Sequence, residues 1–277
     1  MTRCKFSIIF ILLFGVANNA FAADKMKADA YKFGVFPYFS AIRMDNLYSP
    51  ISAELSNRLN HNVKFRTSST FKKFLAKLNA EEYDFALIQP FWYPVAVDKK
   101  SYIPLLKMEE PFVALILTLE GSPIHSVEDL RGKIIATPPA FVPVVHMARK
   151  ALIKKGLVPG KDLTFKAFKS VDSCFQQVLI GKASACVAPP FAPAVFEKAM
   201  NIKLRTLLAS SGIPSLALVI HPRVPKHDQL KIKKIIMSWT NTEKGKKLLD
   251  SMQTRRFTPI DDDEYDVVRK FINEIKK

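Results

Sequence analysis

Aromatic and small polar residues follow the ends of several predicted strands, where an α/β fold places its binding loops. These segments are Pro37–Ser40, Ser68–Thr70, Gln89–Tyr93, Thr137–Phe141 and Pro189–Phe191. Aromatic side chains supply contact area with few rotatable bonds, and hydroxyls and amides fix the orientation of a bound molecule. The pattern predicts a cleft for a small-molecule ligand.

Motifs for catalysis are missing from the sequence. It contains no G-x-S-x-G, no H-E-x-x-H and no glycine-rich phosphate loop. The five histidines stand singly, and the acidic run Asp261–Glu264 suits the start of a helix better than a metal site. We expect a protein that is not an enzyme, with no catalytic residue, no metal and no cofactor.

The order of predicted elements places these segments. Strand and helix patterns alternate from Tyr31 to Val97 and again from Ser126 to Leu208. Each alternation indicates a mostly parallel sheet flanked by helices, so two α/β lobes are expected. The apolar runs Pro111–Leu119 and Leu216–Ile220 are predicted as strands that cross between the lobes.

The start of the chain has the features of an export signal. Arg3 and Lys5 precede the apolar run Phe6–Val16, and Ala20-Phe21-Ala22 fits a cleavage site. We therefore expect residues 1–22 to be a signal peptide cut near Ala22, and the protein to be exported to the periplasm. Residues 23–112 with 214–277 should form the first lobe, and residues 113–213 the second.

The net charge and its distribution indicate which classes of partner the protein can bind. Lys and Arg number 42 against 25 Asp and Glu, a net charge of +17, but the lysines are dispersed over many predicted elements. Dispersed lysines in an exported protein indicate solvated helix faces, so we expect no nucleic-acid partner.

Cys174 and Cys186 could form a disulfide in an oxidising compartment, and the sequence leaves bridged and free states open.

Several motifs resemble a known family of exported binding proteins. They are GVFPY at Gly34–Tyr38, YSPI at Tyr48–Ile51, YDFA at Tyr83–Ala86 with QPFWY at Gln89–Tyr93, SVEDLRGK at Ser126–Lys133 and GKASA at Gly181–Ala185. In this order they resemble the PhnD-like phosphate/phosphite/phosphonate-binding proteins of ABC transporters. The resemblance implies a two-lobed type II periplasmic-binding-protein fold, with two hinge-crossing segments, that closes on its ligand and then meets an inner-membrane permease or another membrane transporter or receptor.

The ligand-defining positions differ from that family. Members of that family typically have a Ser-Thr-Ser-Gly turn after the strand that corresponds to Lys133–Ala136. This chain has Pro138–Val142 at that place. Their Ser-His-Asp step is here Ser170-Val171-Asp172, and Ser184 replaces an acidic residue. Charge-assisted and hydroxyl hydrogen bonds give an oxyanion site its specificity, so we expect a ligand more apolar than a phosphonate, with a lipid or sterol-like molecule as one version.

The predicted ligand-binding residues are drawn from the loops at the strand ends and from the first helix. They are Tyr38, Phe39, Tyr48, Ser69, Thr70, Gln89, Trp92, Tyr93, Thr137, Pro139, Phe141, Val142, Asp172 and Pro190. We expect the protein to be a monomer. Two alternatives for its role remain open: binding of an oxyanion by backbone groups, and a periplasmic sensor that reports its ligand to a receptor kinase. An exported enzyme on the same fold would need a nucleophile or an acid/base pair, which the sequence does not reveal.

Overall fold

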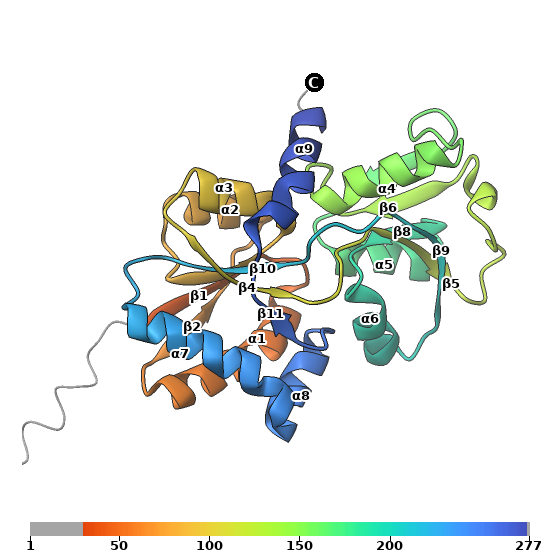
Figure 1. Cartoon of the computed structure of the whole chain (residues 1–277). Helices are drawn as coiled ribbons and strands as arrows, with labels where there is room; N and C mark the ends of the chain where they lie inside the picture. The colour runs from red at the N-terminus through yellow and green to blue at the C-terminus, as the bar shows by residue number, and fades with distance from the viewer. Residues whose placement is uncertain (1–29, 276–277) are drawn as a thin grey trace, which may run out of the picture.

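The structure is a computed structural model, and it describes residues 30–275. It consists of two lobes, each built on one mixed sheet (Figure 1). The predicted signal peptide and its cleavage site near Ala22 lie outside the described residues. Among residues 30–275, no helix combines the length and hydropathy needed to cross a bilayer.

The first lobe has a six-stranded sheet in the order β11-β4-β10-β3-β1-β2. Its strands are β1 (Tyr31–Val35), β2 (Val63–Arg66), β3 (Phe85–Ile88), β4 (Ile103–Met108), β10 (Ala217–Ile220) and β11 (Phe257–Thr258). β1 pairs in parallel with β2 and β3, whereas β10 runs antiparallel to both β3 and β4. The sheet is therefore parallel on one side and antiparallel on the other.

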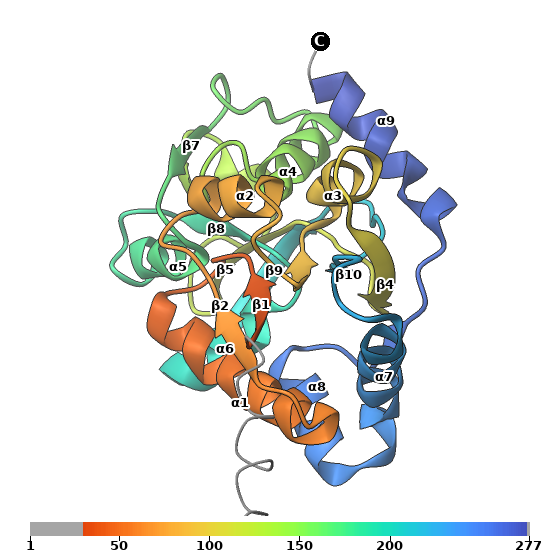
Figure 2. The same ribbon diagram turned by 90° about the vertical axis from the view of Figure 1, so that its left-hand side faces the viewer.

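Helices cover both faces of this sheet (Figures 1 and 2). They are α1 (Ala41–Leu59), α2 (Phe71–Asn79), α3 (Tyr93–Asp98), α7 (Lys226–Met237), α8 (Glu243–Ser251) and α9 (Asp266–Ile275), with short 3-10 turns η2 (Pro90–Trp92), η4 (Ser238–Asn241) and η5 (Asp262–Tyr265). α1, α7 and α8 lie on one face, and α2 and α3 on the other. The C-terminal α9 extends from the first lobe along the side of the second.

The second lobe has a five-stranded sheet in the order β7-β6-β8-β5-β9. Its strands are β5 (Leu115–Leu119), β6 (Ile134–Thr137), β7 (Thr164–Ala167), β8 (Ala185–Ala188) and β9 (Leu204–Ala209). Its helices are α4 (Pro143–Lys154), α5 (Val171–Leu179) and α6 (Ala192–Met200), with the 3-10 turn η3 (Glu128–Leu130). α4 covers one face and α5 and α6 the other (Figure 1).

The two segments that cross between the lobes pair with each other at the hinge. Phe112 and Ile213 exchange two backbone hydrogen bonds, of 2.9 and 3.0 Å, in an isolated antiparallel bridge. The prediction of one strand over Pro111–Leu119 is wrong, because only Leu115–Leu119 belongs to the second sheet. β4 was not predicted, and it occupies the position next to the return strand β10.

Candidate functional site

The lobes meet through aromatic side chains that follow β1. Tyr38 and Phe39 are both buried, at 4% and 3% exposure. The Tyr38 ring meets Phe191 of the second lobe edge-on at 4.8 Å, and Phe39 lies 6.0 Å from Phe196. These contacts bring two predicted ligand-binding residues to the inter-lobe surface.

Asp172 links the lobes by polar contacts. Its carboxylate accepts a hydrogen bond from the backbone N–H of Ser40, the N-cap residue of α1, and lies 3.1 Å from Arg43 Nε. The Arg43 guanidinium also lies over the Phe196 ring at 4.8 Å. A carboxylate from the second lobe therefore occupies the position at a helix N-terminus that favours an anion.

The turn before α4 offers little to an anion. Val142 is the N-cap residue of α4 and makes no capping hydrogen bond, and Pro143 at the first helical position has no N–H. The N–H of Val145 is donated to the Val142 carbonyl at 3.0 Å. Thr137 is buried, Pro139 is half-buried, and Phe141 is 56% exposed with its ring edge-on to Phe71 of α2.

A small cavity of about 10 Å³ lies between these elements, close to the minimum for one water molecule. Its walls come from both lobes: Phe36, Tyr38, Phe71, Gln89, Phe112, Pro138, Val142, Val144, Val171, Pro189 and Phe191. Gln89 is 3% exposed, and its Oε1 has no hydrogen-bond partner in the described part of the chain. A buried amide oxygen without a partner is costly, so a group that donates a hydrogen bond to it would stabilise this arrangement.

A second inter-lobe cavity, of about 190 Å³, lies at the start of α1 and α2, and its wall is both polar and apolar. It is lined by Pro37, Phe39, Ser40, Ala41, Met44, Thr67, Ser68, Ser69, Thr70, Lys169 and Ser170. Ser69 and Thr70, both predicted ligand residues, are exposed here, and Thr70 Oγ1 caps α2 by accepting from the N–H of Lys73 at 3.1 Å. The Thr67 hydroxyl is buried and has no partner among residues 30–275.

Two predicted residues lie in the interior of the first lobe. Tyr48 is fully buried, hydrogen-bonds the Tyr38 hydroxyl at 2.8 Å and stacks on Phe65. Trp92 stacks on Phe74 in the same core. Burial raises the pKa of both Tyr38 and Tyr48, so their hydroxyls stay neutral, and each can donate or accept a hydrogen bond.

Tyr93 lies on the α9 side of the first lobe instead of the cleft. Its hydroxyl donates to Asp262 Oδ1 at 2.6 Å and its ring stacks on Tyr265 at 3.8 Å. Arg269 of α9 also contacts Asp262 at 3.0 Å, and pairs with Asp98 at 2.7 Å. Tyr93 therefore anchors the C-terminal helix, and it does not line either inter-lobe cavity.

The sequence analysis missed several lining residues. Phe36, Phe71 and Phe112 form much of the apolar wall, together with Phe191 of the predicted loop Pro189–Phe191, whose Pro190 is half-buried. Nothing in the local pattern pointed to Lys169 of the polar cavity or to the partner of Asp172. Both depend on how the two lobes face each other.

Cys174 of α5 and Cys186 of β8 are buried free thiols. Burial, together with a hydrogen bond that the Cys186 thiol donates to Cys174, raises the pKa of Cys186 well above its ordinary value. The two thiols are therefore neighbours in the core of the second lobe. Among residues 30–275, no group of three or more His, Cys, Asp or Glu side chains is arranged so that it could hold a metal ion.

Comparison with known proteins places this arrangement in a family. Residues 33–265 match the family model of the ABC-transporter phosphonate periplasmic substrate-binding protein. A search of curated proteins found no significant match. Similar solved structures include the binding protein of an ABC phosphonate transporter from Pseudomonas aeruginosa, with 16% identity, TM-score 0.74, and coverage of 87% of this chain and 84% of that one.

Two further structures share the fold. PhnD1 from Prochlorococcus marinus, in complex with methylphosphonate, has 16% identity and TM-score 0.74, and covers 90% of this chain and 98% of its own. The aliphatic sulphonate-binding protein SsuA from Escherichia coli has 13% identity and TM-score 0.61, with coverage of 90% and 92%. These findings confirm the expected two-lobed fold and a binding role without catalysis. The chain belongs to the phosphonate-binding family of periplasmic substrate-binding proteins of ABC transporters.

Proposed function

We propose that this member of the family carries a small, largely apolar ligand between its lobes and delivers it to an inner-membrane permease. The observation that carries the proposal is Gln89, which lines a cavity walled by aromatic and aliphatic side chains and whose buried amide oxygen has no partner among residues 30–275. Such a site favours a molecule with one donor group and an apolar body. A lipid fragment or a sterol-like molecule satisfies this description.

Ligand entry requires the lobes to separate. The cavity of about 10 Å³ has room for about one water, and Tyr38, Phe191 and Val142 are packed around it. The bridge between Phe112 and Ile213 lies where the two crossing segments meet, and it is the natural pivot. A ligand that binds between the lobes then favours the closed state because it contacts both walls.

An oxyanion in the polar cavity is a second candidate, favoured by Lys169 and by the partnerless hydroxyl of Thr67. The helix α2 starts at this cavity, and its N-terminus adds favourable dipole charge. Asp172 weighs against an anion here, because its carboxylate already holds the N–H of Ser40 at the edge of the same cavity. We therefore place the apolar ligand first.

Two variants separate the candidates. Gln89→Leu keeps the size of the side chain but removes the amide, so it should abolish binding of a donor-bearing apolar ligand and leave any methylphosphonate binding unchanged. Lys169→Ala should abolish any methylphosphonate binding and leave binding of the apolar ligand unchanged. Native mass spectrometry of the protein purified from its own periplasm identifies the natural ligand, and thermal shift with lipid extracts and with methylphosphonate ranks the two classes.

We further propose that the mature protein begins after cleavage near Ala22 and works as a monomer in the periplasm. The motif at Ala20–Ala22 and the basic start of the chain support cleavage. Peptide mapping of the exported protein gives its first residue, and light scattering gives its mass.

A further inference from the structure

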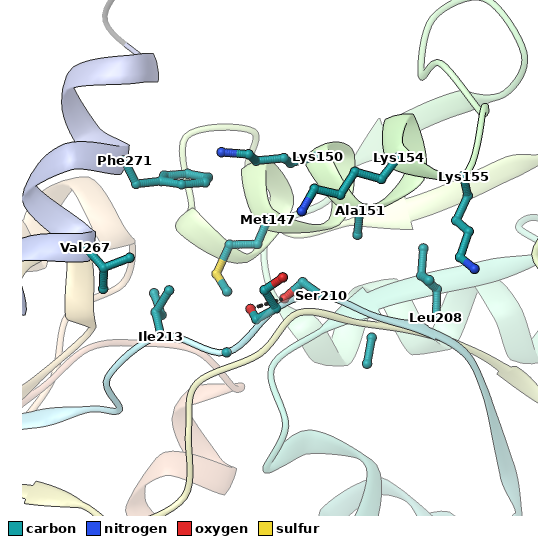
Figure 3. Close-up of a pocket in the computed structure, with 13 residues that line it drawn as sticks. Met147, Lys150, Ala151, Lys154, Lys155, Leu208, Ser210, Ile213, Val267 and Phe271 are labelled. Atoms are coloured by element: carbon teal, nitrogen blue, oxygen red, sulfur yellow. Dashed lines mark hydrogen bonds between the residues drawn. The ribbon is translucent and has the colours of Figure 1, made fainter. Parts of the chain in front are cut away.

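A third cavity, of about 280 Å³, lies on the side of the molecule and shares no lining residue with the two inter-lobe cavities. Three elements enclose it: α4, the end of β9 with the crossing segment that follows, and α9 (Figure 3). α4 and β9 belong to the second lobe, and α9 emerges from the first. The cavity is therefore built across the hinge.

The floor of this side cavity is mostly apolar. It is formed by Met147, Ala151, Leu208, Ile213 and Phe271, with Ser210 and Ser211 as its polar residues (Figure 3). Val267 is 47% exposed in α9, which leaves an apolar surface open at the entrance. Apolar area removed from water here contributes about 25 cal/mol per Å², so an alkyl chain would gain from lying along the floor.

The rim of the side cavity is cationic. Lys150, Lys154 and Lys155 line it, and none of its lining residues is acidic. Lys150 pairs with Glu274 at 2.9 Å, and its Nζ lies 4.9 Å from the centre of the Phe271 ring. Lys154 and Lys155 form no salt bridge within residues 30–275, and Figure 3 shows Lys154 extending from α4 toward the cavity.

We propose that the side cavity binds a single-chain anionic amphiphile, such as a fatty acid. Its alkyl chain would lie on the apolar floor, and its anionic head would lie between Lys154 and Lys155. The two lysines supply the charge complementarity, and the floor supplies the apolar contact. This site goes beyond the inter-lobe ligand proposed above and stands independently of it.

The position of the side cavity also couples it to lobe closure. α9 is fixed to the first lobe, because Phe271 packs edge-on against Phe91 at 5.2 Å and Arg269 pairs with Asp98. The opposite wall, α4, moves with the second lobe. Opening the hinge changes the width of the cavity, so an amphiphile held there binds the open and closed states unequally and shifts their ratio.

A chain-length series tests the ligand class. Calorimetric titration with butanoate, hexanoate, octanoate and decanoate, each below its micelle concentration, should show affinity rising about fourfold per added methylene until the cavity is full. Decanol should bind more weakly than decanoate, and added salt should weaken decanoate alone. Decyl phosphate, compared with decanoate, tells which anionic head the lysines prefer. Equal binding of decanol and decanoate would overturn the proposal.

Two pairs of variants locate the site. Ala151→Trp fills the floor and should abolish decanoate binding, whereas Ile153→Trp, at a 49% exposed position of the same helix outside the cavity, should not. Lys154→Ala with Lys155→Ala should weaken decanoate binding about fivefold or more, and the exposed Lys182→Ala should leave it unchanged. No effect of Ala151→Trp would contradict the assignment.

The inter-lobe variant Gln89→Leu separates this proposal from the proposed function. Decanoate binding that survives Gln89→Leu and is lost in Ala151→Trp supports the side cavity. Decanoate binding lost in Gln89→Leu and kept in Ala151→Trp places the amphiphile between the lobes, which overturns the side site and leaves the proposed function standing.

Discussion

Asp172 of the second lobe accepts a hydrogen bond from the backbone N–H of Ser40 in the first lobe, and its other oxygen lies 3.1 Å from Arg43 Nε. The contact joins the start of α5 to the start of α1. It satisfies a backbone donor at a helix N-terminus with the protein's own carboxylate. The lobes are thus held together by a polar bond beside the aromatic contact of Tyr38 with Phe191.

Asp172→Ala should open the molecule. Loss of the carboxylate leaves the N–H of Ser40 and the Arg43 guanidinium without their partner, which costs the closed state about 1–3 kcal/mol. That is about 5- to 150-fold in the ratio of closed to open molecules. Small-angle X-ray scattering should report a larger radius of gyration.

Asp162→Ala is the matched control for this change. Asp162 pairs with Arg131 at 2.8 Å, and both residues lie within the second lobe. The variant removes a carboxylate and an ion pair without touching the lobe interface. Scattering that is the same for wild type and Asp172→Ala would show that the Asp172 contact does not hold the lobes closed.

Gly34→Ala should destabilise the first lobe. Gly34 lies in β1, and a Cβ there would stand 2.6 Å from the ring of buried Tyr83. Overpacking of this kind costs about 1–3 kcal/mol. Gly121→Ala, where nothing lies within 4 Å of the added Cβ, is the control and should change the unfolding free energy by less than about 0.5 kcal/mol. Equal urea midpoints for the two variants would contradict this packing.

Docking of α9 should weaken in acid. Burial raises the pKa of Asp262, but hydrogen bonds from Tyr93 and Arg269 outweigh it and hold the pKa below its usual value. A carboxyl with a lowered pKa stabilises the fold above its unfolded pKa, near 4, and this contribution is lost as pH falls through the folded pKa. The melting temperature of Asp262→Asn should therefore lie below that of wild type at neutral pH, and the two should converge in acid.

The neighbouring Asp263→Asn supplies the comparison for Asp262. Asp263 forms no salt bridge in the described part of the chain, so its variant should follow wild type at every pH. A difference between wild type and Asp262→Asn that persists unchanged at low pH would argue against the charge-dependent anchor.

Cys174 and Cys186 should resist alkylation in the folded protein. Both are buried, and the raised pKa of Cys186 keeps the more reactive thiolate scarce. Iodoacetamide should label both only after unfolding, as measured by intact mass. Labelling at the rate of a free thiol in the native state would contradict their burial, and labelling that needs a reductant after unfolding would identify a disulfide.

Much of the architecture was predictable because strand and helix periods are local. A few neighbouring residues are enough to predict each of these features. They are the alternation of strands and helices from Tyr31 onward, the GVFPY and QPFWY loops and the two crossing segments. β4 was missed because Ile103–Met108 contains a proline and lacks alternation, and its place beside β10 is a long-range choice.

The candidate site was only partly predictable. Tyr38, Gln89 and Val142 were found because they follow buried strands directly or nearly so, and the structure brings all three to one cavity. Tyr93 does not line the cleft, because its hydroxyl donates a hydrogen bond to Asp262, which is 169 residues further along the chain. Lys169 and the loop Thr67–Thr70 line the same cavity only because the two lobes are closed on each other. No local sequence pattern predicts that arrangement.

The central claim is that the cleft of this protein holds a largely apolar molecule through Gln89. Calorimetric titration of wild type and Gln89→Leu tests it most directly, with methylphosphonate and with the compound released from protein purified from its own periplasm. We expect the released compound to be uncharged, to bind wild type and to fail with Gln89→Leu, and we expect methylphosphonate to bind neither. Tight methylphosphonate binding that is unaffected by Gln89→Leu would contradict the claim.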